Sequence, residues 1–201
     1  MAAAVRRRLV AAALVVPFLL GACSSPAAQP PPVSTSDTTV AEITAGDEYN
    51  DTDVMFLQMF VHHQRQALQM TATAVKRAQD PELKTLAQAV QVTESDELSM
   101  IEGWLKSWGK STEVDTAPNL HAHHGGLPGT GPAEIEALTT VKDTEFDSAF
   151  LSLFLAHQHN AMELANLVRT GGENAETKAF GERVRASRQG GIQQMLKLMT
   201  K

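Results

Sequence analysis

The sequence has little cysteine, few aromatic residues and no excess of basic charge. Its 201 residues include one cysteine, 5% aromatic residues, and 17 Lys and Arg against 23 Asp and Glu. A single cysteine excludes an intramolecular disulfide and a zinc site made of clustered thiolates. The acidic balance argues against nucleic acid as a partner, because a phosphate-binding surface needs clustered Lys and Arg. The length of 201 residues allows one domain or two small ones, and the apolar content is ample for one helical core.

The N-terminal residues have the pattern of an export signal. Three arginines at 6–8 precede an apolar run at 9–20, which is short for a helix that spans a bilayer. The run ends in Leu-Gly-Ala-Cys23, which resembles the bacterial lipobox. The resemblance implies a signal peptide at 1–22, acylation of the Cys23 sulfur, and a lipid bilayer as partner on the extracytoplasmic face of the cell membrane. An ordinary signal peptide with a chance cysteine is the alternative.

Residues 23–46 are rich in Pro, Ser, Thr and Ala and contain three consecutive prolines. A segment of this composition buries too little apolar surface to fold, so we expect a disordered tether. The folded domain is expected at 47–201.

The folded part contains one sequence motif that occurs twice. A shift of 94 residues aligns the chain with itself without gaps. The identities in the first helices are Asp53, Phe56, Leu57, Phe60, His63, Gln64 and Ala67, which fall on Asp147, Phe150, Leu151, Phe154, His157, Gln158 and Ala161. Because identities at one fixed offset are hard to obtain by chance, we interpret them as an internal duplication.

Each unit is expected to form a helical hairpin. Apolar residues recur at three- and four-residue steps within 51–109 and 143–201, which is the period of one helix face. Asp80-Pro81 separates the two helices of the first unit, and a short helix is expected at about 132–140. Two hairpins with apolar faces bury them against each other. The predicted fold class is therefore all-α, an antiparallel four-helix bundle made from a duplicated hairpin.

All seven histidines fall into three clusters, which are His62 and His63; His121, His123 and His124; and His157 and His159. His63 and His157 are equivalent in the duplication, and Met59 and Met70 share the helix face of His63. Imidazole and thioether at helical spacing suit Cu(I), because soft thioethers favour it over hard cations. The alternative is a core histidine that is hydrogen-bonded to Gln64 or Gln158, with methionine as filler.

Glu94 and Glu97 lie on the inward stripe of their helix, where a carboxylate is costly unless it is paired. Their equivalents in the second unit are Arg188 and Gly191. The glutamates are either metal ligands or neighbours of the histidines, or they form an ion pair with Arg188. We favour the ion pair, because the fixed charge of Arg188 opposes a symmetric metal site.

The loop at 110–131 carries the three clustered histidines at 121–124, which form either a weak accessory site for Cu(II), Zn(II) or Ni(II) or a solvated loop.

Enzymatic readings have little support. No histidine has a glutamate three residues before it, as di-iron bundles require. No Ser or Asp has a nucleophile context, and nothing specific supports a haem. We therefore expect a protein that is not an enzyme.

Together, the two hairpins, the order of Asp, Phe-Leu, methionine and histidine in each, and a His-Gly-Gly-Leu-Pro-Gly segment at 124–129 resemble the bacterial family called domain of unknown function 305. The resemblance covers about residues 51–199. It implies a ferritin-like four-helix bundle, frequent export or lipid anchoring, and, for some members, copper binding.

The sequence departs from the family pattern at several expected soft ligands. The family's His-His pair is His63-Gln64 in one unit and His157-Gln158 in the other, with His62 and His159 as flanking residues. Leucine and threonine replace methionines expected in the loop and in the second unit. The first-choice function is a non-enzymatic copper buffer or scavenger outside the cytoplasm. The alternative is a family member without a metal site that acts as an interaction module of the cell envelope.

Overall fold

The structure is a computed structural model that describes residues 43–115 and 129–201. The helices in these ranges are α1 (Asp51–Arg77), α2 (Pro81–Ser107), α4 (Pro132–Thr140), α5 (Asp143–Gly171) and α6 (Ala175–Met199). No strand occurs within them, so the all-α prediction is confirmed. The predicted features that lie outside the described residues are the signal peptide, Cys23, most of the tether, and His121, His123 and His124. None of the described helices is both long enough and apolar enough to cross a membrane.

Local sequence explains where the helices of the first hairpin begin and end. The side chains of Asn50 and Asp53 each accept a hydrogen bond from the other's backbone N–H at the start of α1, which is a capping box. Asp80 caps α2 through the N–H of Glu82 at 2.7 Å, and Pro81 is the first helical residue. Gly109 follows α2 with φ of 64°, a conformation that favours glycine.

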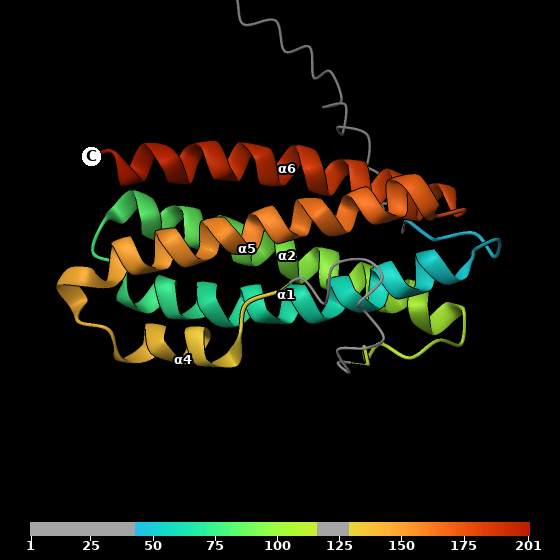
Figure 1. The fold of residues 1–201 in the computed structure, drawn as a ribbon, viewed down its shortest axis with the longest axis horizontal. Coiled ribbons are helices and arrows are strands. Elements are labelled where there is room, and N and C mark those ends of the chain that lie inside the picture. Colours follow the sequence, from blue (N-terminus) through green and yellow to red (C-terminus); the bar gives the residue numbers. More distant parts are fainter. Residues whose placement is uncertain (1–42, 116–128) are drawn as a thin grey trace, which may run out of the picture. The chain divides into compact units, whose positions relative to one another are not determined.

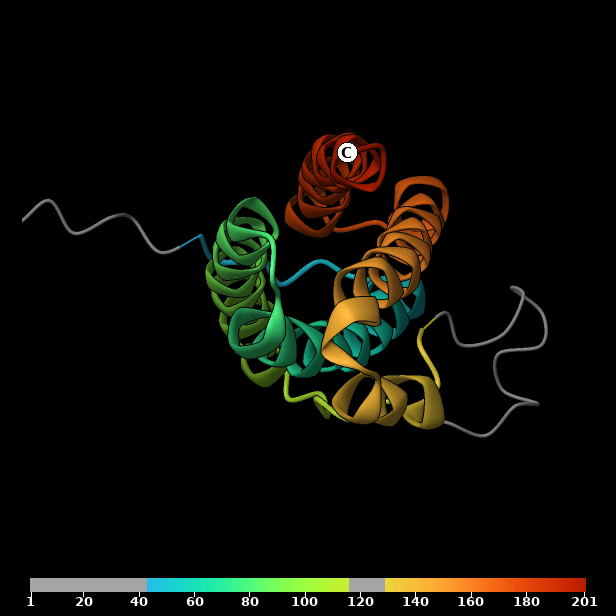
Figure 2. The same ribbon diagram turned by 90° about the vertical axis from the view of Figure 1, so that its left-hand side faces the viewer.

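The four long helices form an antiparallel bundle that is closed on three sides. α1 packs along α2 and along α5, and α5 packs along α6, whereas α2 and α6 make few contacts with each other (Figures 1 and 2). The short helix α4 lies against α1 and α5 on the outside of the bundle. The predicted bundle is confirmed, and its weakest seam lies between α2 and α6.

The core consists of two apolar clusters with a polar layer between them. One cluster includes Phe56, Phe60, Trp104 and Phe180, and the other includes Met70 with three phenylalanines of α5. The polar layer is made of His63, Gln64, Glu94, Glu97, His157, Gln158 and Arg188. Each long helix contributes to both clusters and crosses the polar layer near its middle.

A segment before α1 packs on the C-terminal half of α2. The indole N–H of Trp104 donates to the carbonyl of Ile43 at 2.7 Å, and that of Trp108 donates to the carbonyl of Gly46 at 3.0 Å. The Tyr49 ring stacks on Trp108 with ring centroids 4.2 Å apart. Residues 43 and 46 therefore contact the bundle, although they lie within the predicted tether at 23–46.

A buried aspartate near the start of α1 binds the turn of the second unit. Asp53 has no exposed surface, and its Oδ2 accepts from the backbone N–H groups of Glu173 and Asn174 at 2.9 and 3.0 Å. Its Oδ1 accepts from the hydroxyl of Thr177 at 2.5 Å. A Cβ at Gly172 would lie 2.6 Å from the same Oδ1, so the turn requires glycine there.

The equivalent aspartate of the second unit makes the reciprocal contact. Asp147, near the start of α5, accepts from the backbone N–H groups of Gln79 and Asp80 in the turn of the first unit, at 2.9 and 2.7 Å. Each hairpin thus closes the turn of the other. The repeated aspartate is explained by this exchange between the hairpins.

We expect Asp53→Ala to lower the free energy of unfolding by about 2–4 kcal/mol, because it leaves several buried donors without an acceptor. Asp147→Ala removes the equivalent but more exposed contacts, so its loss should be smaller, about 1–2 kcal/mol. Asp51→Ala, on the exposed surface of the same helix turn, serves as a control. Urea unfolding of the three variants measures the difference, and equal losses for Asp53 and Asp147 would contradict this interpretation.

Candidate metal centre

The two equivalent histidines meet at the centre of the bundle. His63 of α1 and His157 of α5 have no exposed surface, and their rings stack with centroids 3.6 Å apart and an interplanar angle of 16°. Phe60 stacks on the His63 ring and Phe154 on the His157 ring, each at 5.7 Å. The duplication therefore produces a stack of four rings, one histidine and one phenylalanine from each unit.

The hydrogen bonds of the pair define which ring nitrogens are available. His63 Nε2 lies 3.0 Å from the backbone carbonyl oxygen of His157. Because a carbonyl oxygen only accepts, Nε2 carries the proton, and a neutral His63 presents its lone pair at Nδ1. That Nδ1 is buried and has no hydrogen-bond partner. His157 Nδ1 lies 2.9 Å from the Thr130 hydroxyl, and its Nε2 has no partner.

Both imidazoles are held in the neutral form. Burial lowers the pKa of His63 well below its ordinary value of 6.5, and the nearby His157 and Arg188 lower it further. Burial also lowers the pKa of His157 to about 3, with Arg188 as a further cause. Neutral imidazole is the form that binds metal ions, so protons do not compete for the free nitrogens near neutral pH.

The glutamines that follow the histidines bind glutamates of α2. The Gln64 amide donates to Glu97 Oε2 at 2.6 Å, and the Gln158 amide donates to Glu94 Oε1 at 2.9 Å. The two glutamines therefore bind glutamates, while His63 and His157 bind a backbone carbonyl and Thr130. The histidine–glutamine hydrogen bond considered from the sequence is not observed.

Arg188 of α6 pairs with both glutamates. Its Nη2 lies 2.5 Å from Glu97 Oε2 and 3.4 Å from Glu94 Oε1, with side-chain exposures of 4% for Arg188, 15% for Glu97 and 1% for Glu94. Burial raises the pKa of Glu94, which Arg188 partly offsets. The ion pair expected from the inward position of the three residues is present, and it lies in the same layer as the histidine pair.

The other candidate ligands are distributed around the pair. Met59 belongs to one apolar cluster and Met70 to the other, on opposite sides of the polar layer, and both are fully buried. His62 is partly exposed and His159 is exposed. Among the described residues, no group of three His, Cys, Asp or Glu side chains is close enough to hold a metal ion.

The orientation of the two rings limits how His63 and His157 can bind one metal ion. His63 Nδ1 fits as a single ligand, because a ring whose other nitrogen donates to a carbonyl has the arrangement common among metal-bound histidines. His157 Nε2 offers a lone pair in the tautomer whose Nδ1 donates to the Thr130 hydroxyl. A lone pair lies in the plane of its ring, and the two ring planes, inclined by 16° with centroids 3.6 Å apart, meet only well outside both rings. Coordination of one ion by both rings therefore requires at least one ring to rotate.

Thr130 and Gln66 belong to the site. Thr130 is the loop threonine that stands where the family pattern has a methionine, and no sequence pattern selected Gln66. The Gln66 amide donates to the Thr130 carbonyl at 2.8 Å and accepts from the Thr130 N–H at 3.0 Å. Gln66 Nε2 also lies 3.0 Å from His62 Nε2. A Cβ at Gly129 would lie 2.6 Å from the Gln66 side chain, so a glycine beside Thr130 was the one available signal for Gln66.

Comparison with known proteins identifies relatives of this fold. A DUF305 fragment from Deinococcus radiodurans has a TM-score of 0.66 and 21% identity, over 75% of this chain and 97% of that one. A DUF305 protein of Streptomyces coelicolor, described as a candidate secreted protein, has a TM-score of 0.68 and 23% identity, over 74% and 92%. CopM in a Cu(I)-bound form has a TM-score of 0.60 and 24% identity, over 74% and 95%.

No curated protein matches the sequence significantly. The family described as "Domain of unknown function (DUF305)" matches residues 53–199, which is most of the chain and contains both hairpins. This protein therefore belongs to the DUF305 family.

Proposed function

We propose that this protein binds copper as cargo outside the cytoplasm, where it buffers or scavenges the ion, and that it is anchored to the membrane through Cys23. The observation that carries the copper proposal is the state of His63. Its Nε2 donates to a backbone carbonyl, and its Nδ1 is a buried lone pair without a partner. A neutral imidazole oriented in this way is ready to bind a soft cation.

The arrangement favours Cu(I) over harder ions. His63 and His157 supply two nitrogen ligands after a ring rotation, and Met59 and Met70 supply thioethers from the clusters on either side. We infer that at least one of these methionines completes the site. His62 and His159 are more exposed and would act only at the entrance.

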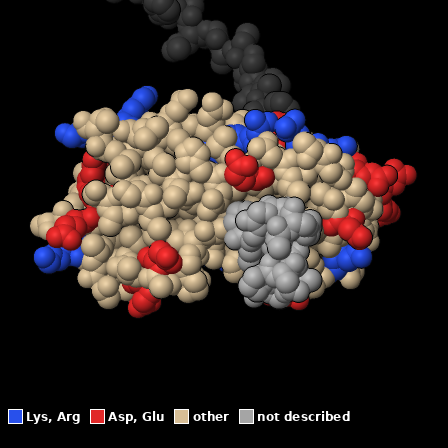
Figure 3. Space-filling model, in the orientation of Figure 1, with Lys and Arg blue, Asp and Glu red and all other residues tan. Residues whose placement is uncertain are grey.

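The relatives and the sequence support this proposal. CopM has been solved in Cu(I)-, Cu(II)- and Ag-bound forms, and the Streptomyces relative is described as a candidate secreted protein. The N-terminal residues have the pattern of a lipoprotein signal. Acidic and basic side chains are interspersed on the face in Figure 3, so that face offers no broad basic surface to nucleic acid.

The test is a Cu(I) competition titration against a chromogenic chelator, with His63→Ala/His157→Ala beside the parent protein. Changes in the surroundings of a metal ligand already weaken binding by about 10–100-fold, so loss of both ligands should weaken Cu(I) binding at least that much. The control is His159→Ala, which removes an exposed imidazole at the entrance and should change Cu(I) affinity far less than the double variant does.

Unchanged stoichiometry in the double variant would remove the bundle centre as the copper site. In that case a variant that lacks His121, His123 and His124 decides whether the loop binds the ion. Circular dichroism of the double variant confirms that the bundle is still folded.

The second candidate is an envelope interaction module without a metal site. The close stacking of the two histidines and the charge of Arg188 in the same layer favour it. A metal ion linked to the folded state would stabilise it by about 2.7 kcal/mol at a hundredfold excess over Kd. An interaction module would show the same melting temperature with Cu(I) and with a chelator.

A further inference from the structure

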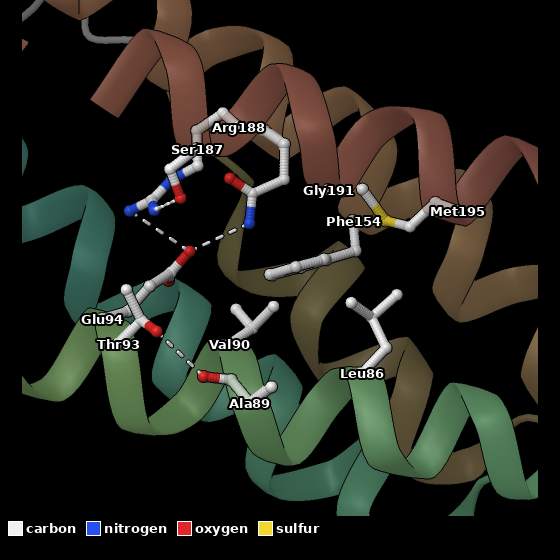
Figure 4. A pocket seen from close by; sticks show the side chains of 11 residues that line it. Leu86, Ala89, Val90, Thr93, Glu94, Phe154, Ser187, Arg188, Gly191 and Met195 are labelled. Atoms are coloured by element: carbon white, nitrogen blue, oxygen red, sulfur yellow. Dashed lines mark hydrogen bonds and ion pairs between the residues drawn. The ribbon is translucent and has the colours of Figure 1, made fainter. Parts of the chain in front are cut away.

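A pocket of about 160 Å³ opens between α2 and α6, at the seam where these helices make few contacts. Figure 4 shows its walls, which include Leu86 and Val90 of α2, Phe154 of α5 and Met195 of α6. One end of the pocket reaches the polar layer at Glu94, Gln158 and Arg188. Neither histidine of the candidate metal centre is among its lining residues. The pocket is therefore apolar along its length and charged at one end.

The pocket lies where the duplication is broken. Gly191, one of its lining residues, is the equivalent of Glu97, and a Cβ built on it would meet nothing within 4 Å. Glycine inside a helix is less favourable than alanine, and no close backbone contact requires it here. The position that carries a side chain in the first unit is thus open space in the second.

Buried polar atoms beside the pocket have no partner. Glu94 is 1% exposed, and its Oε1 accepts from Gln158 and contacts Arg188, but its Oε2 has no hydrogen bond. Gln158 Oε1 is also without a donor. Both residues line the pocket, as does Arg188, whose Nε is also buried without a partner. Two buried acceptors without donors are costly, and a ligand that donates hydrogen bonds would satisfy them.

The charges of the layer specify the sign of such a ligand. Two carboxylates, Glu94 and Glu97, face one guanidinium, Arg188, which already makes its shortest contact with Glu97. Glu94 is therefore the carboxylate with the weaker compensation. A buried surplus negative charge is stabilised by a proton or by a cation.

We propose that this pocket binds a small organic cation, with a primary ammonium at Glu94 and a short apolar body along Leu86, Val90, Phe154 and Met195. An ammonium has three donors and no acceptor, which matches the unpartnered oxygens of Glu94 and Gln158. An apolar cavity of about 150 Å³ holds a benzene molecule, so the pocket admits a body of about four to six carbons. This site is separate from the proposed copper function.

The test uses n-butylammonium as the probe, titrated calorimetrically into the purified full-length protein, with 1-butanol and butyrate as neutral and anionic analogues. Butylammonium should bind saturably, and at least about tenfold more tightly than either analogue, because a hydrogen bond to a charged group contributes about 1.5–3 kcal/mol. Equal binding of butanol, or no saturable binding of butylammonium, would overturn the proposal.

Two neighbouring glycines provide matched variants. Gly191→Met fills the pocket, whereas Gly190→Met adds the same side chain to an exposed position of the same helix that does not line it. Butylammonium binding should weaken at least about tenfold in Gly191→Met and should be unchanged in Gly190→Met. Equal affinity in the two variants would overturn the proposal, as would unaltered binding in Glu94→Gln. Cu(I) binding of Gly191→Met, measured in parallel, separates this result from the copper function.

Discussion

Replacement of Arg188 by methionine is expected to lower the free energy of unfolding by about 3–5 kcal/mol, the cost of removing one partner from a buried ion pair. Arg188 is 4% exposed and its guanidinium contacts both Glu94 and Glu97. Without it, two carboxylates in the centre of the bundle lose their counter-ion, although methionine fills a comparable volume. Urea unfolding at neutral pH measures the loss.

The control for this prediction is Arg185→Met, one turn earlier on α6. Arg185 is 37% exposed and pairs with Glu182 at 3.3 Å within the same helix. Such exposed pairs contribute less than about 1 kcal/mol. Addition of Glu94→Gln and Glu97→Met to Arg188→Met should recover much of the lost stability, because replacing a whole buried ion pair is often neutral. If Arg188→Met and Arg185→Met cost the same, the ion pair does not stabilise the bundle.

Most of the fold could be predicted from the sequence because its signals are local or repeated. The 94-residue offset gives two equivalent hairpins, and the Asp80-Pro81 pair marks the start of α2 as observed. The short helix expected at 132–140 is α4, Pro132–Thr140. Each of these features depends on the spacing of apolar residues or on one capping residue, which the sequence displays directly.

The site was predicted less completely because it depends on helix rotation and side-chain rotamers. Equivalence in the duplication selected His63 and His157, and the inward stripe selected Glu94 with Arg188. The stacking of the two rings and the donation from His63 to a carbonyl follow from tertiary placement alone. The contact of Thr130 with His157 joins residues of different elements and has no periodic signal.

The open seam between α2 and α6 also could not be predicted. From the sequence, Gly191 indicates only that no side chain occupies this position. Neighbouring helices can pack closely against a glycine or can leave a pocket beside it, and the structure contains the pocket. The position of α6 depends on its packing along α5 and on the ion pair of Arg188 with α2. Both effects are non-local.

The neutral histidine pair makes a second large prediction, which is that the folded protein loses stability steeply on acidification. In the unfolded chain both histidines bind protons below about pH 6.5. In the folded protein His157 does so only near pH 3, and the pKa of His63 is also well below 6.5. The unfolded state therefore binds more protons in this window, so the free energy of unfolding falls as the pH falls.

The expected slope approaches about 2.7 kcal/mol per pH unit, from about 1.36 for each histidine, between pH 6 and pH 4.5. Glu94 acts in the opposite direction, because its raised pKa lets the folded state bind a proton before the unfolded state does. That contribution reduces the slope toward the acid end of the window and leaves the direction unchanged near pH 6.

Urea unfolding at pH 7.5, 6.5, 5.5 and 5.0 tests this prediction with His63→Leu/His157→Leu as the variant. The pH slope of the double variant should be smaller by up to about 2.7 kcal/mol per unit, because no buried imidazole remains to be protonated on unfolding. His159→Leu removes an exposed histidine and should retain the slope of the parent protein. A double variant with the parent's slope would mean that the buried pair is not neutral in the folded state, and the lone pair on which copper binding depends would then not be available.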